Sequence, residues 1–181
     1  MSRFQEVAQV VLGHEGGLSD HPADKGGRTN LGITQSTLTG ARKSISGLPE
    51  KVDDLTAAQA LEIYRKLYWD KSKCDEIPTP LDFLVFDAAI NCGVGGAGIQ
   101  LQRALNKIGA SLSVDGAIGT LTLTAVREAV RKGRWGLLLA GALWERVIWH
   151  NDIIAKDASQ AVFKEGWLNR IAKNATIAGV E

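Results

Sequence analysis

The sequence predicts a mainly helical protein with one small glycine-rich hairpin or loop segment near its N-terminus. Three observations lead to this prediction. Apolar residues recur at spacings of three and four more often than two, which is the period of amphipathic helices. Gly, Asp, Asn and Pro gather in one segment, 18–33, and these residues favour turns. With 181 residues, 45% of them hydrophobic, the chain can bury the core of one domain, or of one domain with a small second lobe.

The first helix is expected from the apolar residues Phe4, Val7, Val11 and Leu12, and it should end at the glycine pair 16–17. The turn-rich segment follows, and a second helix is expected over residues 35–42. These elements place the glycine-rich segment directly after the first helix.

A third helix should open at Thr56, whose hydroxyl can cap it while Gln59 reaches back in a capping box. Its expected apolar face consists of Leu61, Tyr64, Leu67 and Tyr68.

Pro78 and Pro80 mark the best internal boundary, because proline stops one helix and suits the first turn of the next. They divide the chain into regions 1–78 and 79–181. The glycine-rich stretch 93–98 fits the G-x-G-x-x-G pattern of dinucleotide-binding folds, but its flanks read as helices rather than strands, which argues against nucleotide binding. The helices expected in the second region span 81–92, 99–108, 118–131, 135–156 and 159–177, with a turn at 114–116.

Charge and composition exclude several classes of function. The formal net charge is +1, so no strong field attracts nucleic acid or an anionic membrane. The most apolar stretch, 135–144, has about half of the ~20 residues that a membrane span needs, so no stable membrane insertion is expected. Trp135, Trp144, Trp149 and Trp167 fall on helix faces expected to be buried.

Two cysteines, Cys74 and Cys92, suggest reduced thiols, with one disulfide left open. Neither cysteine nor any of the three histidines has the spacing of metal ligands, so we expect no metal and no organic cofactor.

The segment with the most chemical information runs from His14 to Thr34. Glu15 ends an apolar helix, where partial burial would raise its pKa and keep it protonated. Asp24, nine positions on, lies among Lys25, glycines and polar residues and should stay ionised. A neutral acid and a second carboxylate are what hydrolysis of a glycosidic bond requires. The residues alone leave open that both are ordinary surface carboxylates beside a turn.

The ordered run of Glu15-Gly-Gly and Pro22-Ala-Asp-Lys-Gly-Gly-Arg-Thr-Asn-Leu-Gly-Ile-Thr34 resembles the signature of glycoside hydrolase family 108, which contains muramidases of phages, prophages and bacteria. The resemblance implies a lysozyme-like helical fold. It also implies that Glu15 is the general acid and that Asp24 and Thr29 position or activate water. Leu18 departs from the pattern, because an aromatic residue is expected after the two glycines.

The second half resembles the predicted peptidoglycan-binding region that follows this catalytic segment in the family. The similarity is carried by Phe86-Asp-Ala-Ala-Ile-Asn-Cys-Gly93 and Val114-Asp-Gly-Ala-Ile-Gly119, among shorter matches. We expect region 79–181 to form the other wall of one cleft. Candidate sugar contacts, chosen for side chains that hydrogen-bond hydroxyl and acetamido groups, are Asn30, Tyr68, Asn91 and Gln102, with helix caps and packing as their alternative roles.

The expected function is that of an endolysin that hydrolyses the β-1,4 bond between N-acetylmuramic acid and N-acetylglucosamine in peptidoglycan. Two alternatives stay open: a lytic transglycosylase, which needs one glutamate, and a wall-binding module without turnover. Nothing in the sequence suggests more than a monomer. The N-terminus lacks the long apolar run of a secretory signal, so we expect the protein to accumulate in the host cytoplasm and to reach the cell wall after a phage-made membrane lesion.

Overall fold

The computed structural model describes residues 1–14 and 28–180. The chain separates into two compact units, Met1–Lys71 and Ser72–Glu181, so it divides earlier than the boundary predicted at residue 78. Each unit is described by itself below, and a shared cleft between the two regions stays a prediction.

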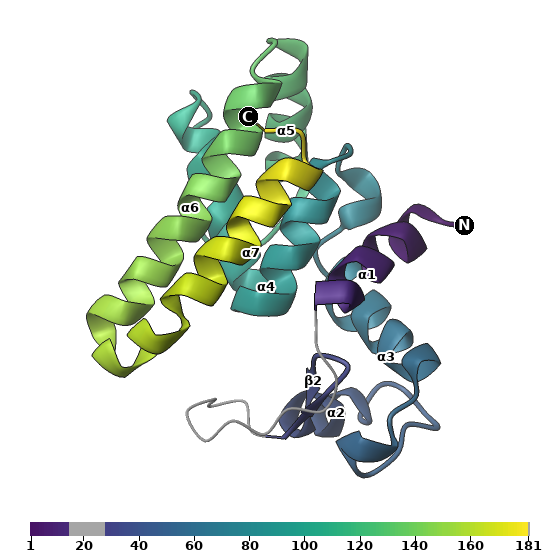
Figure 1. The fold of residues 1–181 in the computed structure, drawn as a ribbon. Coiled ribbons are helices and arrows are strands. Elements are labelled where there is room, and N and C mark those ends of the chain that lie inside the picture. The colour runs from purple at the N-terminus through teal and green to yellow at the C-terminus, as the bar shows by residue number, and fades with distance from the viewer. Residues whose placement is uncertain (15–27, 181) are drawn as a thin grey trace. The chain divides into compact units, whose positions relative to one another are not determined.

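The first unit contains short helices and one hairpin (Figure 1). Its elements are α1 (Arg3–His14), β1 (Thr29–Asn30), β2 (Ile33–Thr34), α2 (Gln35–Ala41), the 3₁₀ helix η1 (Val52–Asp54), α3 (Ala57–Tyr64) and the π-helix η2 (Arg65–Trp69).

Threonine caps start two of these helices. Thr34 accepts a hydrogen bond from the Thr37 N–H at the start of α2. At Thr56 both bonds of a capping box with Gln59 are present, which confirms the predicted start of α3. Caps of this kind satisfy amide groups that the first helical turn leaves without a partner.

The apolar face predicted for α3 is only partly correct. Tyr64 is buried, but Leu61, Leu67 and Tyr68 are half-buried, and Trp69 is fully buried instead. For Leu67, Tyr68 and Trp69 the reason is the π-helical turn, in which the Asp70 N–H donates to the Arg65 carbonyl, five residues back, at 2.9 Å. A turn with an extra residue rotates the side chains that follow it away from the 3.6-residue pattern. The edge of the Phe4 ring meets the Trp69 ring, with centroids 5.5 Å apart.

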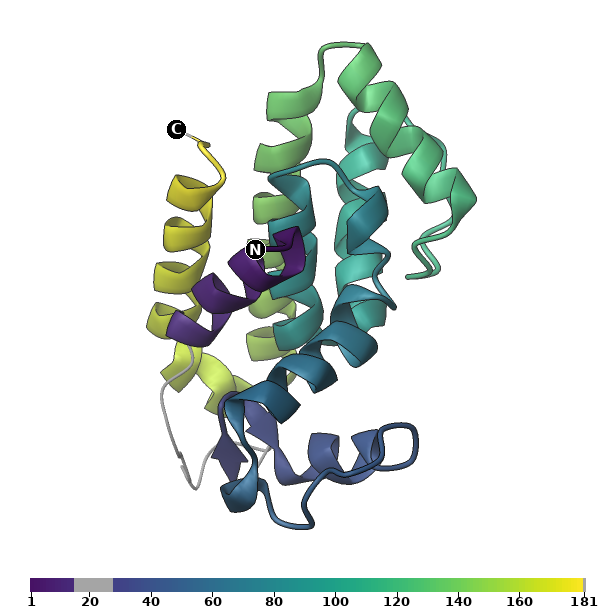
Figure 2. The ribbon, with the colours of Figure 1, turned by 90° about the vertical axis from the view of Figure 1, so that its right-hand side faces the viewer.

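The second unit is built almost entirely from helices (Figure 1). They are α4 (Leu81–Lys107), α5 (Thr120–Arg131), α6 (Trp135–Lys156) and α7 (Lys164–Ile177), with the short 3₁₀ helices η3 (Cys74–Glu76) and η4 (Ala158–Phe163). Helix α6 packs along α4, α7 packs on α6, and α5 lies against α4 (Figure 2). In the described residues the only sheet is the two-stranded hairpin, so the prediction of a mainly helical fold is confirmed.

The glycine-rich stretch does not interrupt the helices as predicted. Only Gly93 leaves helical geometry, with φ 76° and ψ 157°, and the helix resumes directly after this kink. Gly98 has no side chain, and this lets the loop around Gly116 pack directly against the helix. A Cβ on Gly98 would lie only 2.0 Å from the Gly116 carbonyl oxygen. Close packing therefore explains this glycine better than a turn does.

Among the described helices, only α4 has the length and apolar composition that crossing a membrane would require. Its most apolar window is 61% buried inside the protein, as in a core helix. The sequence prediction overlooked this stretch because it expected a break at Gly93.

The predicted burial of the tryptophans is wrong for Trp144, whose exposed fraction is 58%. Trp135, Trp149 and Trp167 are half-buried. Helix α6 contacts α4 and α7 on part of its circumference, so an apolar residue on its remaining face stays in solvent.

Candidate functional site

The predicted site residues are divided between the two units. Glu15 and Asp24 lie outside the described residues. Thr29 and Asn30 form strand β1, and Tyr68 lies in the π-helix η2, all in the first unit. Asn91 and Gln102 lie on α4 of the second unit, on either side of the kink at Gly93. Their roles toward a substrate stay predictions.

The hairpin that carries Thr29 has a tight two-residue turn. Thr29 pairs with Thr34 and Asn30 pairs with Ile33 across the antiparallel strands. The turn residues Leu31 and Gly32 have φ of 50° and 72°. Two successive residues at positive φ are typical of a type I′ turn, which matches the twist of the flanking strands. Leucine rarely adopts this conformation, so Leu31 is strained.

Side chains from neighbouring segments anchor the hairpin, because two residues per strand cannot hold it alone. The Asn30 amide donates to the Val52 carbonyl at 2.9 Å. Gln35 donates to the Glu50 carbonyl and accepts from the Val52 N–H, each at 2.8 Å. An ion pair of 2.6 Å joins Arg28 to Asp53. These contacts tie both ends of the hairpin to segment 50–53.

Tyr64 supports the turn from inside the unit. Its side chain is 1% exposed, and its hydroxyl donates to the Leu31 carbonyl at 2.8 Å. Thr29, on strand β1, lies two residues before Leu31 in the sequence. Tyr64 therefore holds the turn of the hairpin that carries Thr29, whereas sequence reasoning assigned Tyr64 only to an apolar helix face.

Replacing Tyr64 by Phe is expected to lower kcat for peptidoglycan cleavage several-fold with little change in KM. The ring still fills its place, but the strained Leu31 carbonyl loses its donor, at a cost of about 1–3 kcal/mol, and Thr29 is held less firmly. Steady-state rates on soluble glycan strands measure this effect.

Leu31→Gly supplies the control, because glycine adopts positive φ without strain. The double variant relieves the backbone strain but restores no donor to the carbonyl at position 31, so it should regain stability without regaining the lost kcat. A Tyr64→Phe variant that loses stability but keeps its full kcat would show that the tyrosine is only structural.

Tyr68 lies close to the same region of the first unit. Its ring is 5.9 Å from that of Tyr64, centroid to centroid. Burial raises the pKa of its phenol, and a hydrogen bond with Thr37 partly offsets the rise. The hydroxyl therefore stays protonated at neutral pH and can donate a hydrogen bond.

The two predicted residues of the second unit differ in exposure. Asn91 is exposed, and its amide donates to the Asp87 carbonyl at 2.9 Å. Gln102 is buried, donates to Asp115 at 2.8 Å and accepts from the Gly116 N–H at 2.8 Å. Gln102 therefore anchors loop 115–117, while its role as a sugar contact stays a prediction.

A buried ionic cluster joins three helices of the second unit around Asp87, which is 0% exposed. On one carboxylate oxygen, Arg146 and Asn174 donate at 3.1 and 2.7 Å. The other carboxylate oxygen accepts a hydrogen bond from Arg170 Nε at 2.8 Å, and Arg170 Nη2 lies 2.7 Å from the same oxygen. The sequence carried a signal that we did not use: an aspartate inside the apolar run 81–90, which burial requires to be paired.

His150 completes this cluster as a neutral side chain. Burial, and then the charge of Arg146, lower its pKa to about 4. Its Nε2 accepts from Arg146 at 3.2 Å, and its ring stacks on Trp167 with centroids 4.4 Å apart. Burial likewise raises the pKa of the nearby Cys92 thiol. Cys74 and Cys92, the two cysteines of the chain, are not joined by a disulfide.

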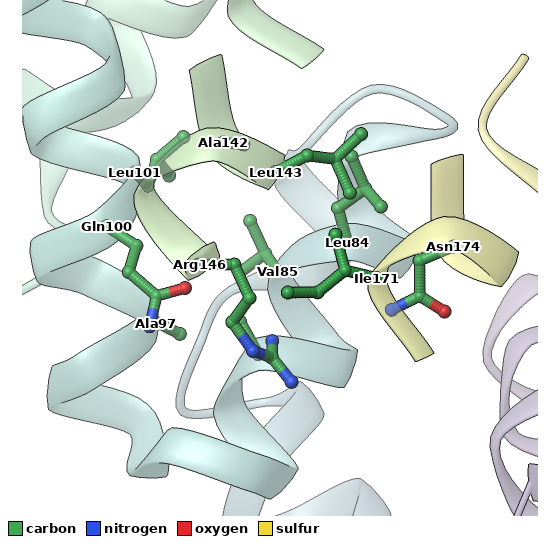
Figure 3. A pocket seen from close by; sticks show the side chains of 11 residues that line it. Leu84, Val85, Ala97, Gln100, Leu101, Ala142, Leu143, Arg146, Ile171 and Asn174 are labelled. Atoms are coloured by element: carbon green, nitrogen blue, oxygen red, sulfur yellow. The ribbon is translucent and has the colours of Figure 1, made fainter. Parts of the chain in front are cut away.

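A small cavity lies beside the cluster, between α4, α6 and α7 (Figure 3). Gln100, Arg146 and Asn174 line it together with aliphatic side chains such as Leu84 and Ile171. Its volume of about 20 Å³ is far below the roughly 300–1,000 Å³ of ligand sites, so it belongs to the core. Within the described ranges, no group of three or more His, Cys, Asp or Glu side chains could hold a metal ion.

Comparison with known proteins identifies two regions in this chain. The family profile described as Glycosyl hydrolase 108 matches residues 8–93, and the one described as Predicted Peptidoglycan domain matches residues 97–172. No curated protein matches. Among solved structures, that of Brucella abortus SagA is 31% identical and aligns with a TM-score of 0.81, over 97% of this chain and 92% of that one.

The fold and the two matched regions define a peptidoglycan-degrading glycoside hydrolase with a lysozyme-like, mainly helical fold. The chain belongs to glycosyl hydrolase family 108. The family resemblance expected from the motif around Glu15 is thereby confirmed.

Proposed function

We propose that this enzyme is an N-acetylmuramidase, which hydrolyses the β-1,4 bond between N-acetylmuramic acid and N-acetylglucosamine. The observation that carries the proposal is the match to the hydrolase family over residues 8–93, which contains Glu15, Asp24 and Thr29. The anchored hairpin supports it, because a residue that positions water must itself be held in place.

In the proposed mechanism Glu15 is protonated in the resting enzyme and transfers its proton to the leaving glycosidic oxygen. Asp24 and Thr29 orient a water molecule on the opposite face of the sugar ring, and Asp24 accepts a proton from that water as it attacks. This inverting reaction requires the two carboxyl groups to lie roughly 6.5–9.5 Å apart. Its product carries a free reducing end on muramic acid.

The masses of the fragments released from purified peptidoglycan test this proposal. A muramidase leaves reducing N-acetylmuramic acid, because water is added across the bond. A lytic transglycosylase leaves 1,6-anhydro-muramic acid, which is lighter by one water, and a binding module releases nothing. Either of the last two results would overturn the proposal, and digestion by an authentic muramidase provides the matched reference.

We further propose that the enzyme acts as a phage or prophage endolysin. The resemblance of its motif to muramidases of phages and prophages supports this role. Such an enzyme accumulates in the host cytoplasm and reaches the periplasmic cell wall after a phage-made lesion opens the membrane.

A further inference from the structure

The lining of one groove in the second unit contains none of the predicted sugar contacts. The groove has a volume of about 310 Å³, at the lower end of the range for ligand sites. The end of α4, the loop 108–112 and helix α5 form its walls. Its lining includes Leu105, Ile108, Leu112, Ala125, Lys132 and Arg134.

Hydrogen bonds hold the loop wall in place. The Asn106 amide donates to the Leu112 carbonyl at 2.9 Å and accepts from the Leu112 N–H at 2.8 Å. The Arg134 guanidinium donates to the Ile108 carbonyl on the same loop. Gly109 has φ 97°, and a Cβ there would meet Arg134 at 2.8 Å. The groove is therefore preformed, which lowers the entropy lost when a ligand binds.

The groove combines short aliphatic side chains with an excess of positive charge. Its charged lining residues are Glu128, Lys132 and Arg134. Hydrogen bonds from Arg131 and Lys132 lower the pKa of Glu128 to about 2, so it is ionised at neutral pH. One negative and two positive charges leave a net charge of +1, which favours a ligand with carboxylate groups.

A second hollow of about 240 Å³ continues the groove, because Leu112 and Leu121 line both. Leu121, at the shared edge, is 77% exposed. The exposed carboxylate of Asp115 lines this second hollow, and a hydrogen bond from Gln102 lowers its pKa. An elongated ligand would thus meet cations at one end and an anion at the other.

Peptidoglycan contains one component with this chemistry. Its stem peptides carry alanine methyl groups, several free carboxylates and, in many bacteria, one amine. The N-acetylated sugars carry no free amine, and the lactyl carboxyl of N-acetylmuramic acid is tied up in an amide bond wherever a stem peptide is attached. The lining of the groove also contains no aromatic ring on which a sugar could stack.

We propose that this groove binds the stem peptide of peptidoglycan, with Lys132 and Arg134 facing its carboxylates and Ala125 and Leu112 its methyl groups. The proposal rests on the proposed function in taking peptidoglycan as the substrate. The whole groove lies within residues 97–172, which match the peptidoglycan domain.

The test is a calorimetric titration of the full chain with free stem tetrapeptide. An amidase releases this tetrapeptide from peptidoglycan. Ala125→Phe fills the groove and Lys132→Gln removes one cation, and each should raise the Kd at least about tenfold, a change of 1.4 kcal/mol.

Two variants serve as matched controls. Ala140→Phe makes the same change on the exposed face of α6, outside the groove. Glu128 forms ion pairs with both Arg131 and Lys132, and Arg131→Gln removes the one whose side chain does not line the groove. Both should keep the wild-type Kd.

Absence of tetrapeptide binding to the wild-type chain, or equal Kd values for groove and control variants, would overturn the proposal. The titration needs no bond cleavage, so its outcome is independent of the muramidase assignment. Digestion of glycan strands stripped of their peptides tests that assignment separately.

Discussion

Glu15→Gln is expected to lower the rate of peptidoglycan cleavage by roughly 10²–10⁴-fold, the usual contribution of a general acid. Glutamine has the shape of the protonated acid but cannot give up a proton to the leaving oxygen. The change is measured as the loss of turbidity of outer-membrane-stripped cells and as soluble fragments released from purified sacculi.

Glu6→Gln is the matched control, because it makes the same substitution on α1 at an exposed position. Its ion pair with Arg3, at 3.5 Å, is also exposed, so the loss of stability should be below about 1 kcal/mol. Glu15→Gln should still bind sacculi and unfold at the wild-type temperature. A Glu15→Gln variant that lyses cells at half the wild-type rate would refute the role of Glu15 as the acid.

Asp87→Asn is expected to destabilise the second unit by about 3–5 kcal/mol, because it leaves two buried guanidinium groups without their shared carboxylate. Urea unfolding followed by tryptophan fluorescence measures this change. Four of the five tryptophans belong to this unit, so the signal reports mainly on it.

Glu76→Gln tests whether burial causes the effect. Glu76 forms ion pairs with Lys73 at 3.9 Å and Arg127 at 3.7 Å, but its side chain is 49% exposed. Removal of an exposed pair should cost less than about 1 kcal/mol. Adding Arg146→Met to Asp87→Asn should restore part of the lost stability, because one orphaned charge is then gone. Equal losses in Asp87→Asn and Glu76→Gln would contradict the structural role of the cluster.

Several elements of the fold follow from local sequence. The capping box at Thr56 and the 135–156 helix lie where the sequence placed them. Caps and helical periods involve residues within about four positions of one another, so a single segment contains the necessary information. The family was also recognisable, because its motif around Glu15 is continuous in the sequence.

Contacts between residues far apart in the sequence could not be predicted in the same way. Tyr64 and Leu31 are 33 residues apart, and Asp87 and Arg170 are 83 apart. No local pattern reports such a pairing. The π-helical turn before Trp69 and the exposure of Trp144 likewise depend on which face of a helix finds a neighbour.

The sequence by itself determined the mainly helical class, the helix caps and the family motif with Glu15, Asp24 and Thr29. The tertiary structure alone decided which distant side chains meet within each unit: Tyr64 and the hairpin turn in the first, and the paired charges around Asp87 and the contact of Gly98 with Gly116 in the second. The physical reason is that local propensities depend on residues a few positions apart. Buried polar groups, in contrast, must form hydrogen bonds or ion pairs with whichever groups the packing of the chain brings next to them.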